Sequence, residues 1–163
     1  MIGNRAIDYP VTLKRAADEG NLIANHSYCH VYKELYQSPE AFKADILKTQ
    51  DIIKNIVRPE HLTNLMRMPG GGYEKDKAPF RKAANDIGMV YIDWNAENGD
   101  GHSNHLTVAE SVANVEQFAK TKEDIVLLMH DAPVKESTYL SLEQNINLLK
   151  SYGFEFRVLN QYD

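Results

Sequence analysis

Two histidines four positions apart, His26 and His30, are the first residues in this sequence that could bind a metal. Imidazole is the commonest protein ligand for zinc and similar divalent ions, and side chains at this spacing can point the same way from a helical turn or a tight loop. The pair is therefore a candidate half-site for a divalent metal. Because the chain contains six histidines, two surface or hydrogen-bonded core histidines would explain the spacing equally well.

Three more polar residues that could take part in chemistry are Arg67, Asp93 and His130. Each of them, like His26, stands one or two positions after a segment that we predict to be a β-strand. The carboxyl ends of parallel strands meet at one edge of a sheet or barrel, where the active sites of α/β proteins gather. We therefore expect these four residues to lie at one rim, which indicates an enzyme or a metal-binding relic of one.

Strand and helix patterns alternate along the chain. Short apolar runs predict strands over residues 22–24, 62–66, 89–92, 125–129 and 154–159. Apolar residues at helical spacing predict helices over residues 10–19, 39–57, 74–87, 107–120 and 137–152. Ser38 and Thr107 are the expected N-caps of two of these helices. The alternation predicts an α/β fold with a parallel sheet or barrel.

Length and composition predict one globular domain over residues 1–163, since 43% of the residues are hydrophobic and 25% are charged. The net charge of −5 and the lack of a Lys/Arg run give no indication of a nucleic-acid partner. No apolar stretch approaches the roughly 20 residues of a membrane-spanning helix. Cys29 is the only cysteine, so an intrachain disulfide is excluded.

Four short motifs occur in a fixed order along the chain. They are His26 to His30 as His-x-x-x-His, Arg67 to Gly71 as Arg-x-Pro-x-Gly, Asp93-Trp94, and Leu128-Met129-His130 as Leu-x-His. With these motifs the chain resembles the polysaccharide deacetylases, also called carbohydrate esterase family 4 or the NodB-homology domain. Arg67-Met68-Pro69-Gly70-Gly71 and Asp93-Trp94-Asn95 look most like the peptidoglycan N-acetylglucosamine deacetylases of Gram-positive bacteria.

The resemblance implies a metal centre at the first motif. His26 and His30 would hold a divalent ion, zinc in the first place, with cobalt or nickel as alternatives. Such an ion polarises the acetamide carbonyl and acidifies a bound water. The backbone N–H of Gly70 would stabilise the tetrahedral oxyanion.

The resemblance also implies roles for the remaining motif residues. His130 would protonate the leaving sugar amine, and Asp93 would orient its imidazole. Trp94 and Leu128 would wall a small pocket for the acetyl methyl group. Arg67 matches the arginine that tunes a catalytic aspartate in the family.

Plainer roles would fit several of the same residues. Arg67 would also fit an ordinary surface ion pair, Asp93 a helix cap, and Trp94 a core position. His130 would fit a hydrogen-bonded histidine at a strand end. The tyrosines that follow His26 would either line a sugar groove or cover the loop: Tyr28, Tyr32 and Tyr36.

One motif of the family is absent from this chain. The family's first strand carries Thr-Phe-Asp-Asp-Gly, in which one aspartate is the general base and the other is the third metal ligand. Its absence predicts an N-terminally truncated domain and an incomplete (β/α) barrel that lacks its first strand or strands. Two histidines alone make an incomplete zinc site, because three protein ligands are usual. Open sheet edges in such a barrel predict pairing with a second copy of the chain.

The resemblance implies a hydrolase of carbon–nitrogen bonds other than peptide bonds. Its substrate would be a polysaccharide that carries N-acetyl groups, such as peptidoglycan or chitin-like N-acetylglucosamine polymers. The missing aspartates leave open a second function, that of a catalytically inactive remnant that binds glycan. Deacetylation of another polymer, such as acetylated xylan, is a third. Family members usually work outside the cell or at its envelope, so the resemblance implies that location.

Overall fold

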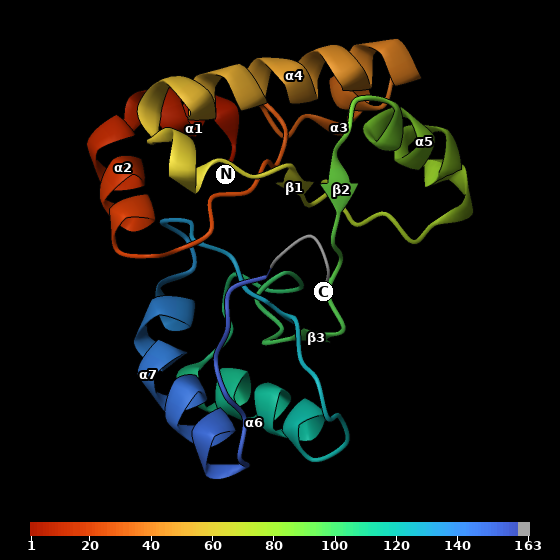
Figure 1. Cartoon of the computed structure of the whole chain (residues 1–163). Helices are drawn as coiled ribbons and strands as arrows, with labels where there is room; N and C mark the ends of the chain where they lie inside the picture. Colours follow the sequence, from red (N-terminus) through yellow and green to blue (C-terminus); the bar gives the residue numbers. More distant parts are fainter. Residues whose placement is uncertain (160–163) are drawn as a thin grey trace. The chain divides into compact units, whose positions relative to one another are not determined.

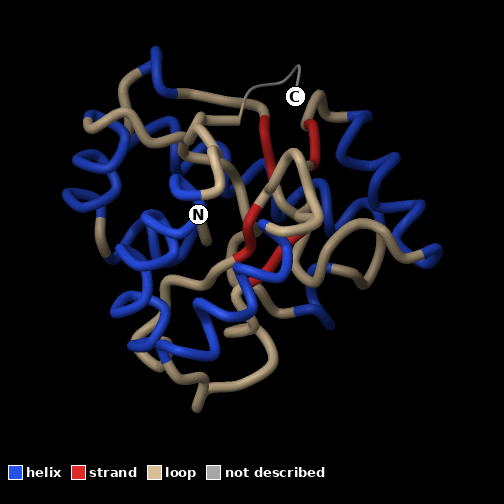
Figure 2. The backbone as a smooth tube through the Cα atoms, turned by 90° about the horizontal axis from the view of Figure 1, so that it is seen from below, coloured by secondary structure: helices blue, strands red, loops and turns tan. Residues whose placement is uncertain are grey.

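The computed structural model describes residues 1–159, which form two compact units (Figure 1). The N-terminal unit contains Met1–Asp93 together with Val158 and Leu159, and the C-terminal unit contains Trp94–Arg157. Figure 2 shows that helices and loops make up most of the backbone and that the strands are short. Parallel strands alternate with helices in both units, as the α/β prediction requires.

The N-terminal unit packs its helices around one pair of short parallel strands. β1 (Leu65–Met66) pairs with β2 (Val90–Tyr91), with Leu65 opposite Val90 and Met66 opposite Tyr91. The helical segments are α1 (Gly3–Asp8), α2 (Pro10–Asp18), α3 (Tyr32–Leu35), α4 (Pro39–Ile56), η1 (Pro59–His61), η2 (Lys75–Lys77) and α5 (Ala78–Asp86).

The long helix α4 begins where its sequence predicts. The Ser38 hydroxyl accepts a hydrogen bond from the Ala41 N–H at 3.1 Å, and Pro39 occupies the first helical turn, where its missing N–H costs nothing. Figure 1 shows α1 and α5 against different stretches of α4. The buried face of α4 carries Phe42, Ile46 and Ile53, at the spacing of one helical stripe.

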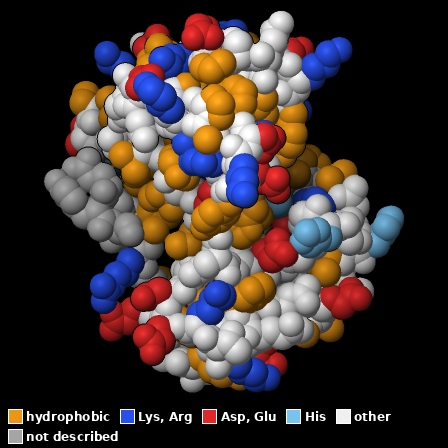
Figure 3. Space-filling view, turned by 90° about the vertical axis from the view of Figure 1, so that its right-hand side faces the viewer, with side chains coloured by type: hydrophobic (Ala, Val, Ile, Leu, Met, Phe, Trp, Pro, Cys, Tyr) orange, Lys and Arg blue, Asp and Glu red, His pale blue; other side chains and the backbone are white. Residues whose placement is uncertain are grey.

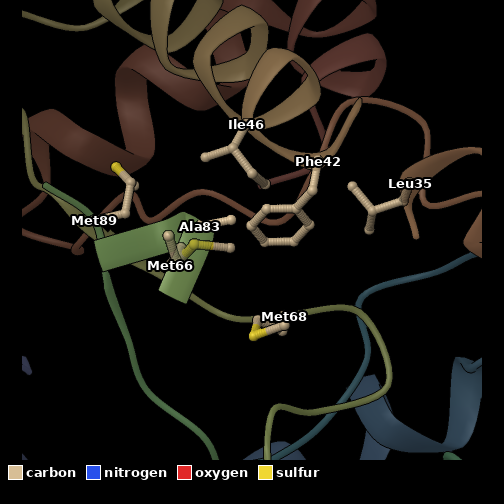
Figure 4. Close-up of a cluster of buried hydrophobic side chains, with 8 residues drawn as sticks. Leu35, Phe42, Ile46, Met66, Met68, Ala83 and Met89 are labelled. Atoms are coloured by element: carbon tan, nitrogen blue, oxygen red, sulfur yellow. The ribbon is translucent and has the colours of Figure 1, made fainter. Parts of the chain in front are cut away.

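A buried apolar cluster joins α4 and α5 to the two strands. Its members are Leu35, Phe42, Ile46, Met66, Met68, Ala83, Ala84 and Met89 (Figure 4). Met66 and Met68 belong to this cluster, so the backbone between them is fixed on both sides of Arg67. The core therefore sets the position at which Arg67 leaves β1.

The C-terminal unit is built from two helices and a second pair of parallel strands. β3 (Ala96–Glu97) pairs with β4 (Leu127–Leu128), with Ala96 opposite Leu127 and Glu97 opposite Leu128. α6 (Val108–Ala119) packs against α7 (Glu136–Ser151). The capping box predicted at Thr107 is present, because its side chain accepts from the Glu110 N–H and the Glu110 carboxylate accepts from the Thr107 N–H.

Two predicted strands are wrong. Residues 22–24 form no strand, and the neighbouring Asn25 makes a single bridge to Met66. Residues 154–159 are loop, and the exposed Phe156 and Val158 lack the cover that a strand's apolar side chains need. Conversely, β3 was not predicted, because two residues are too few to show a period.

An incomplete (β/α) barrel was predicted, and the strand pairing confirms only the α/β part of that prediction. Within residues 1–159 the strands form two separate two-stranded parallel sheets, and no sheet closes on itself. Each ladder is only two residues long, so neither can supply the continuous, staggered pairing that a barrel needs.

None of the helices within residues 1–159 has both the length and the apolar character needed to cross a bilayer. On the face of the molecule in Figure 3, side chains of Lys and Arg are interspersed with those of Asp and Glu. This mixture agrees with the small net charge of −5.

We expect Phe42→Ala to lower the free energy of unfolding by about 3–5 kcal/mol, because Phe42 is fully buried and packs against the rings of Tyr36 and Phe80. Leu47→Ala on the same helix is the matched control, since Leu47 is 46% exposed, and its cost should stay below about 1 kcal/mol. Urea denaturation measures both values. Equal losses would contradict this assignment of the core.

Candidate functional site

His26 and His30 lie side by side in the loop before α3. Their ring centroids are 4.9 Å apart, and Nδ1 of His26 is 2.7 Å from the carbonyl oxygen of Arg67. A carbonyl can only accept, so Nδ1 carries the proton and Nε2 keeps its lone pair. Burial lowers the pKa of His26 to about 3, although the bond to Arg67 acts in the opposite direction. His26 is therefore neutral near pH 7, the state in which imidazole binds metals.

The backbone of this loop takes an uncommon conformation that polar side chains hold in place. Ser27 and His30 have φ values of 65° and 60°, which are rare for residues other than glycine. The Ser27 N–H donates to Oδ1 of Asn25, and the His30 N–H donates to Oγ of Ser27, both at 3.1 Å. Asn25 is tied in turn to the Ile46 carbonyl at 2.9 Å. The sequence analysis did not assign this role to Asn25 and Ser27, although both are typical residues of such turns.

The two imidazoles fit two ligand positions of a divalent ion. Within residues 1–159, no group of three or more His, Cys, Asp or Glu side chains comes together as a metal site. Catalytic zinc sites usually have three protein ligands and one open position. Cys29 does not complete the set, because its thiol contacts Glu34 at 3.6 Å. The role of His26 and His30 as metal ligands therefore stays a prediction.

Arg67 and Asp93 follow neighbouring strands of one sheet, as predicted from their positions after β1 and β2. Burial raises the pKa of Asp93, and the Gly72 N–H and the positive charges of Arg67 and Arg81 oppose that rise only in part. Burial lowers the pKa of Arg67, and the negative charge of Asp93 partly offsets that decrease. The two charges are thus electrostatically coupled at this edge of the sheet.

Asp93 also holds the glycine-rich loop. Its two carboxylate oxygens accept from the Gly72 N–H at 3.0 and 2.9 Å, while the Arg81 guanidinium donates to the Gly72 carbonyl. Gly70 lies two residues earlier with φ of 76°, and a Cβ there would come within 2.9 Å of the Tyr32 hydroxyl. Only glycine fits that position without a shift. Asp93 and Arg81 therefore fix the loop that contains Gly70, whose N–H was predicted to stabilise the oxyanion.

His130 belongs to the C-terminal unit, where a different carboxylate holds it. Its Nδ1 is 2.7 Å from Oδ1 of Asp100, and its backbone N–H donates to Oδ2 of Asp100 at 2.7 Å. Asp100 thus holds the His130 imidazole, and the orienting role that we predicted for Asp93 stays a prediction. β3 and β4 are parallel neighbours, so the residues that follow them meet at one end. Without β3, the sequence offered no reason to place Asp100 beside His130.

The chemistry of this pair is that of a positioned proton donor. Burial would raise the pKa of Asp100, but hydrogen bonds from the His130 imidazole and N–H and from the Thr138 hydroxyl outweigh it and leave the pKa below its usual value. Asp100 is therefore ionised near pH 7 and faces a half-exposed imidazole. With Nδ1 bonded to Asp100, Nε2 is the nitrogen that can exchange a proton with a substrate.

The two residues predicted to line an acetyl pocket both lie in the C-terminal unit. Leu128 is a buried residue of β4, and Trp94 is half-buried at the start of the unit. Their shared role remains a prediction.

Comparison with known proteins agrees with the motifs. A family model described as polysaccharide deacetylase matches residues 1–92. The chain is 27% identical over 162 residues to the peptidoglycan-N-acetylglucosamine deacetylase PgdA of Listeria monocytogenes and 28% identical over 163 residues to YheN of Bacillus subtilis. The alignments cover 98–99% of this chain but only 31% of PgdA and 56% of YheN.

A solved structure gives the same result for the fold. The crystal structure of the catalytic domain of peptidoglycan N-acetylglucosamine deacetylase from Eubacterium rectale matches with a TM-score of 0.85 at 29% sequence identity. The match covers 98% of this chain and 74% of that domain. The fold is therefore the α/β fold of these deacetylases, and the chain belongs to the polysaccharide deacetylase family, carbohydrate esterase family 4.

Proposed function

We propose that this chain takes part in the metal-dependent hydrolysis of N-acetyl groups on an amino-sugar polymer, peptidoglycan or a chitin-like polymer of N-acetylglucosamine. The observation that carries the proposal is the contact of 2.7 Å between His130 and the buried Asp100. Amide hydrolysis needs a proton for the leaving amine, and an imidazole held by a carboxylate is suited to supply it near neutral pH.

The metal chemistry would come from the N-terminal unit. His26 and His30 would hold the ion, with zinc the first candidate and cobalt and nickel the alternatives. When bound, such an ion polarises the acetyl carbonyl and lowers the pKa of a coordinated water. The carbonyl of Arg67 fixes the His26 ring in the tautomer that leaves Nε2 free for metal.

The remaining residues would orient the substrate and stabilise charge. The N–H of Gly70 would donate to the oxyanion of the tetrahedral intermediate, on a loop held by Asp93. The positive charge of Arg67 would act to lower the pKa of Asp93 and so favour the ionised carboxylate that holds that loop. With both ring nitrogens protonated, His130 would give its Nε2 proton to the sugar amine as the C–N bond breaks, and the Asp100 carboxylate would stabilise that imidazolium before the transfer. Trp94 and Leu128 would enclose the acetyl methyl group.

The names of two relatives support the proposed polymer and the proposed place of action. PgdA and the Eubacterium rectale enzyme are named for peptidoglycan N-acetylglucosamine. On that basis we place the activity at the cell envelope or outside the cell.

A second candidate function is glycan binding without turnover. It is favoured by the metal centre, in which the described residues supply only two ligands. A site of that kind would bind metal weakly and would leave the acetyl group uncleaved.

Acetate release from N-acetylglucosamine oligomers separates the two candidates. We expect release that needs added zinc or cobalt, stops on chelation, and falls at least about a hundredfold in His30→Asn. Asparagine tolerates the left-handed backbone of this position, so the loop should persist. His61→Ala is the control, because His61 lies beside Asp18. Oligomer binding without acetate release would favour the second function, and release without metal would contradict both.

Asp100→Asn tests the proton donor. We expect kcat to fall at least about a hundredfold, because an amide cannot stabilise an imidazolium as a carboxylate does. Asp131→Asn removes the exposed charge next to His130 in the sequence and should change kcat little. If the two variants lose the same activity, Asp100 has no special role.

A further inference from the structure

The first turns of α7 bury polar side chains and expose apolar ones. Thr138, Ser141 and Asn145 are buried, whereas Tyr139 and Leu140 are 77% and 54% exposed. A surface helix normally turns its apolar stripe inward, because that burial provides most of its stability. The inward face of α7 must therefore be matched by polar partners.

Those partners form a hydrogen-bonded network between α6 and α7. The hydroxyls of Ser111 and Ser141 are 2.9 Å apart, and the Asn145 amide donates to Ser111 at 3.2 Å. The Asn98 amide donates to Ser111 at 3.3 Å and to Oγ1 of Thr138 at 3.4 Å. Every member is buried, so the network sets one register between the two helices and brings Thr138 to its edge.

Thr138, held in place by this network, contacts Asp100, the carboxylate that holds His130. Its hydroxyl donates to Oδ2 of Asp100 at 2.8 Å, and both residues are buried. Oδ2 also accepts from the His130 N–H, whereas Oδ1 faces Nδ1 of the same residue. With Oδ2 held by two donors from different segments, the carboxylate plane is fixed and Oδ1 is aimed at the imidazole.

We propose that Thr138 is a positioning residue for His130, acting through Asp100. Its hydroxyl fixes the rotamer of the carboxylate, and the buried polar face of α7 is built to hold that hydroxyl. The inference rests on the proposed function in one respect: the role of His130 as proton donor.

The electrostatics of Asp100 agree with this role. Burial favours the neutral form of Asp100, and the hydrogen bonds from His130 and Thr138 reverse that preference and lower its pKa. Among the described residues, the titratable side chains in contact with Asp100 are those of His130 and Lys135, and the Lys135 ammonium donates to the Asp100 carbonyl. Thr138→Val keeps the shape of the side chain and removes its donor. Oδ2 of the buried Asp100 would then lose the hydrogen bond from the Thr138 hydroxyl.

The titration of the Asp100 carboxyl, followed by carbon-13 NMR, tests the proposal. We expect Thr138→Val to move its midpoint to higher pH, with the wild-type value kept in Thr138→Ser, which restores the hydroxyl. Thr49→Val is the matched control, because it makes the same substitution at a buried threonine of α4 whose hydroxyl donates to the Asp45 carbonyl, outside this network. In assays on N-acetylglucosamine oligomers, Thr138→Val should lower kcat roughly tenfold to a hundredfold with little change in KM.

An unchanged Asp100 titration in Thr138→Val would overturn the proposal, as would an equal shift in Thr49→Val. If Thr138→Val does not fold, the wild-type protein decides: a slowly exchanging Thr138 hydroxyl proton coupled to Asp100 supports the proposal, and its absence overturns it. A wild-type chain that releases no acetate counts against the proposed function alone, because the titration needs no turnover.

Discussion

A carboxylate that is buried must be surrounded by donors, and the C-terminal unit is arranged around Asp100 in this way. Moving an ionised carboxylate out of water costs several kcal/mol unless charge or hydrogen bonds compensate it. Asp100 is 1% exposed and accepts from the imidazole and N–H of His130 and from the Thr138 hydroxyl. The parallel pair of β3 and β4 brings Asp100 to His130, and α7 brings Thr138 to Asp100. The same contacts that satisfy the charge give the imidazole a single orientation.

In the N-terminal unit, backbone groups hydrogen-bond to the side chains of the candidate site and fix their orientation. The buried cluster around Met66 and Met68 fixes the chain at Arg67, whose carbonyl holds the ring of His26. Asp93, at the end of the neighbouring strand, holds the glycine-rich loop through the Gly72 N–H. The packing of the core therefore determines the tautomer of one candidate ligand and the shape of the candidate oxyanion loop.

The sequence predicts this molecule best where local rules decide the outcome. The caps at Ser38 and Thr107 are local hydrogen bonds, and the helices that follow them begin as predicted. Arg67 and Asp93 follow neighbouring strands, as predicted, because the apolar runs before them are long enough to indicate strands. The partner of His130 could not be predicted, because it depends on β3, a strand of two residues without a visible pattern. The incomplete barrel was confirmed only as an α/β fold, because strand pairing over long separations cannot be predicted from any short segment.

The central claim is that Asp100 holds His130 in one tautomer, with the proton on Nδ1 and Nε2 left to exchange a proton with the substrate. Nitrogen-15 NMR of the histidine rings at neutral pH measures this directly, through long-range couplings that distinguish the two ring nitrogens. The account predicts that His130 carries its proton on Nδ1 in the folded wild-type chain. A proton on Nε2, with Nδ1 unprotonated, would contradict it.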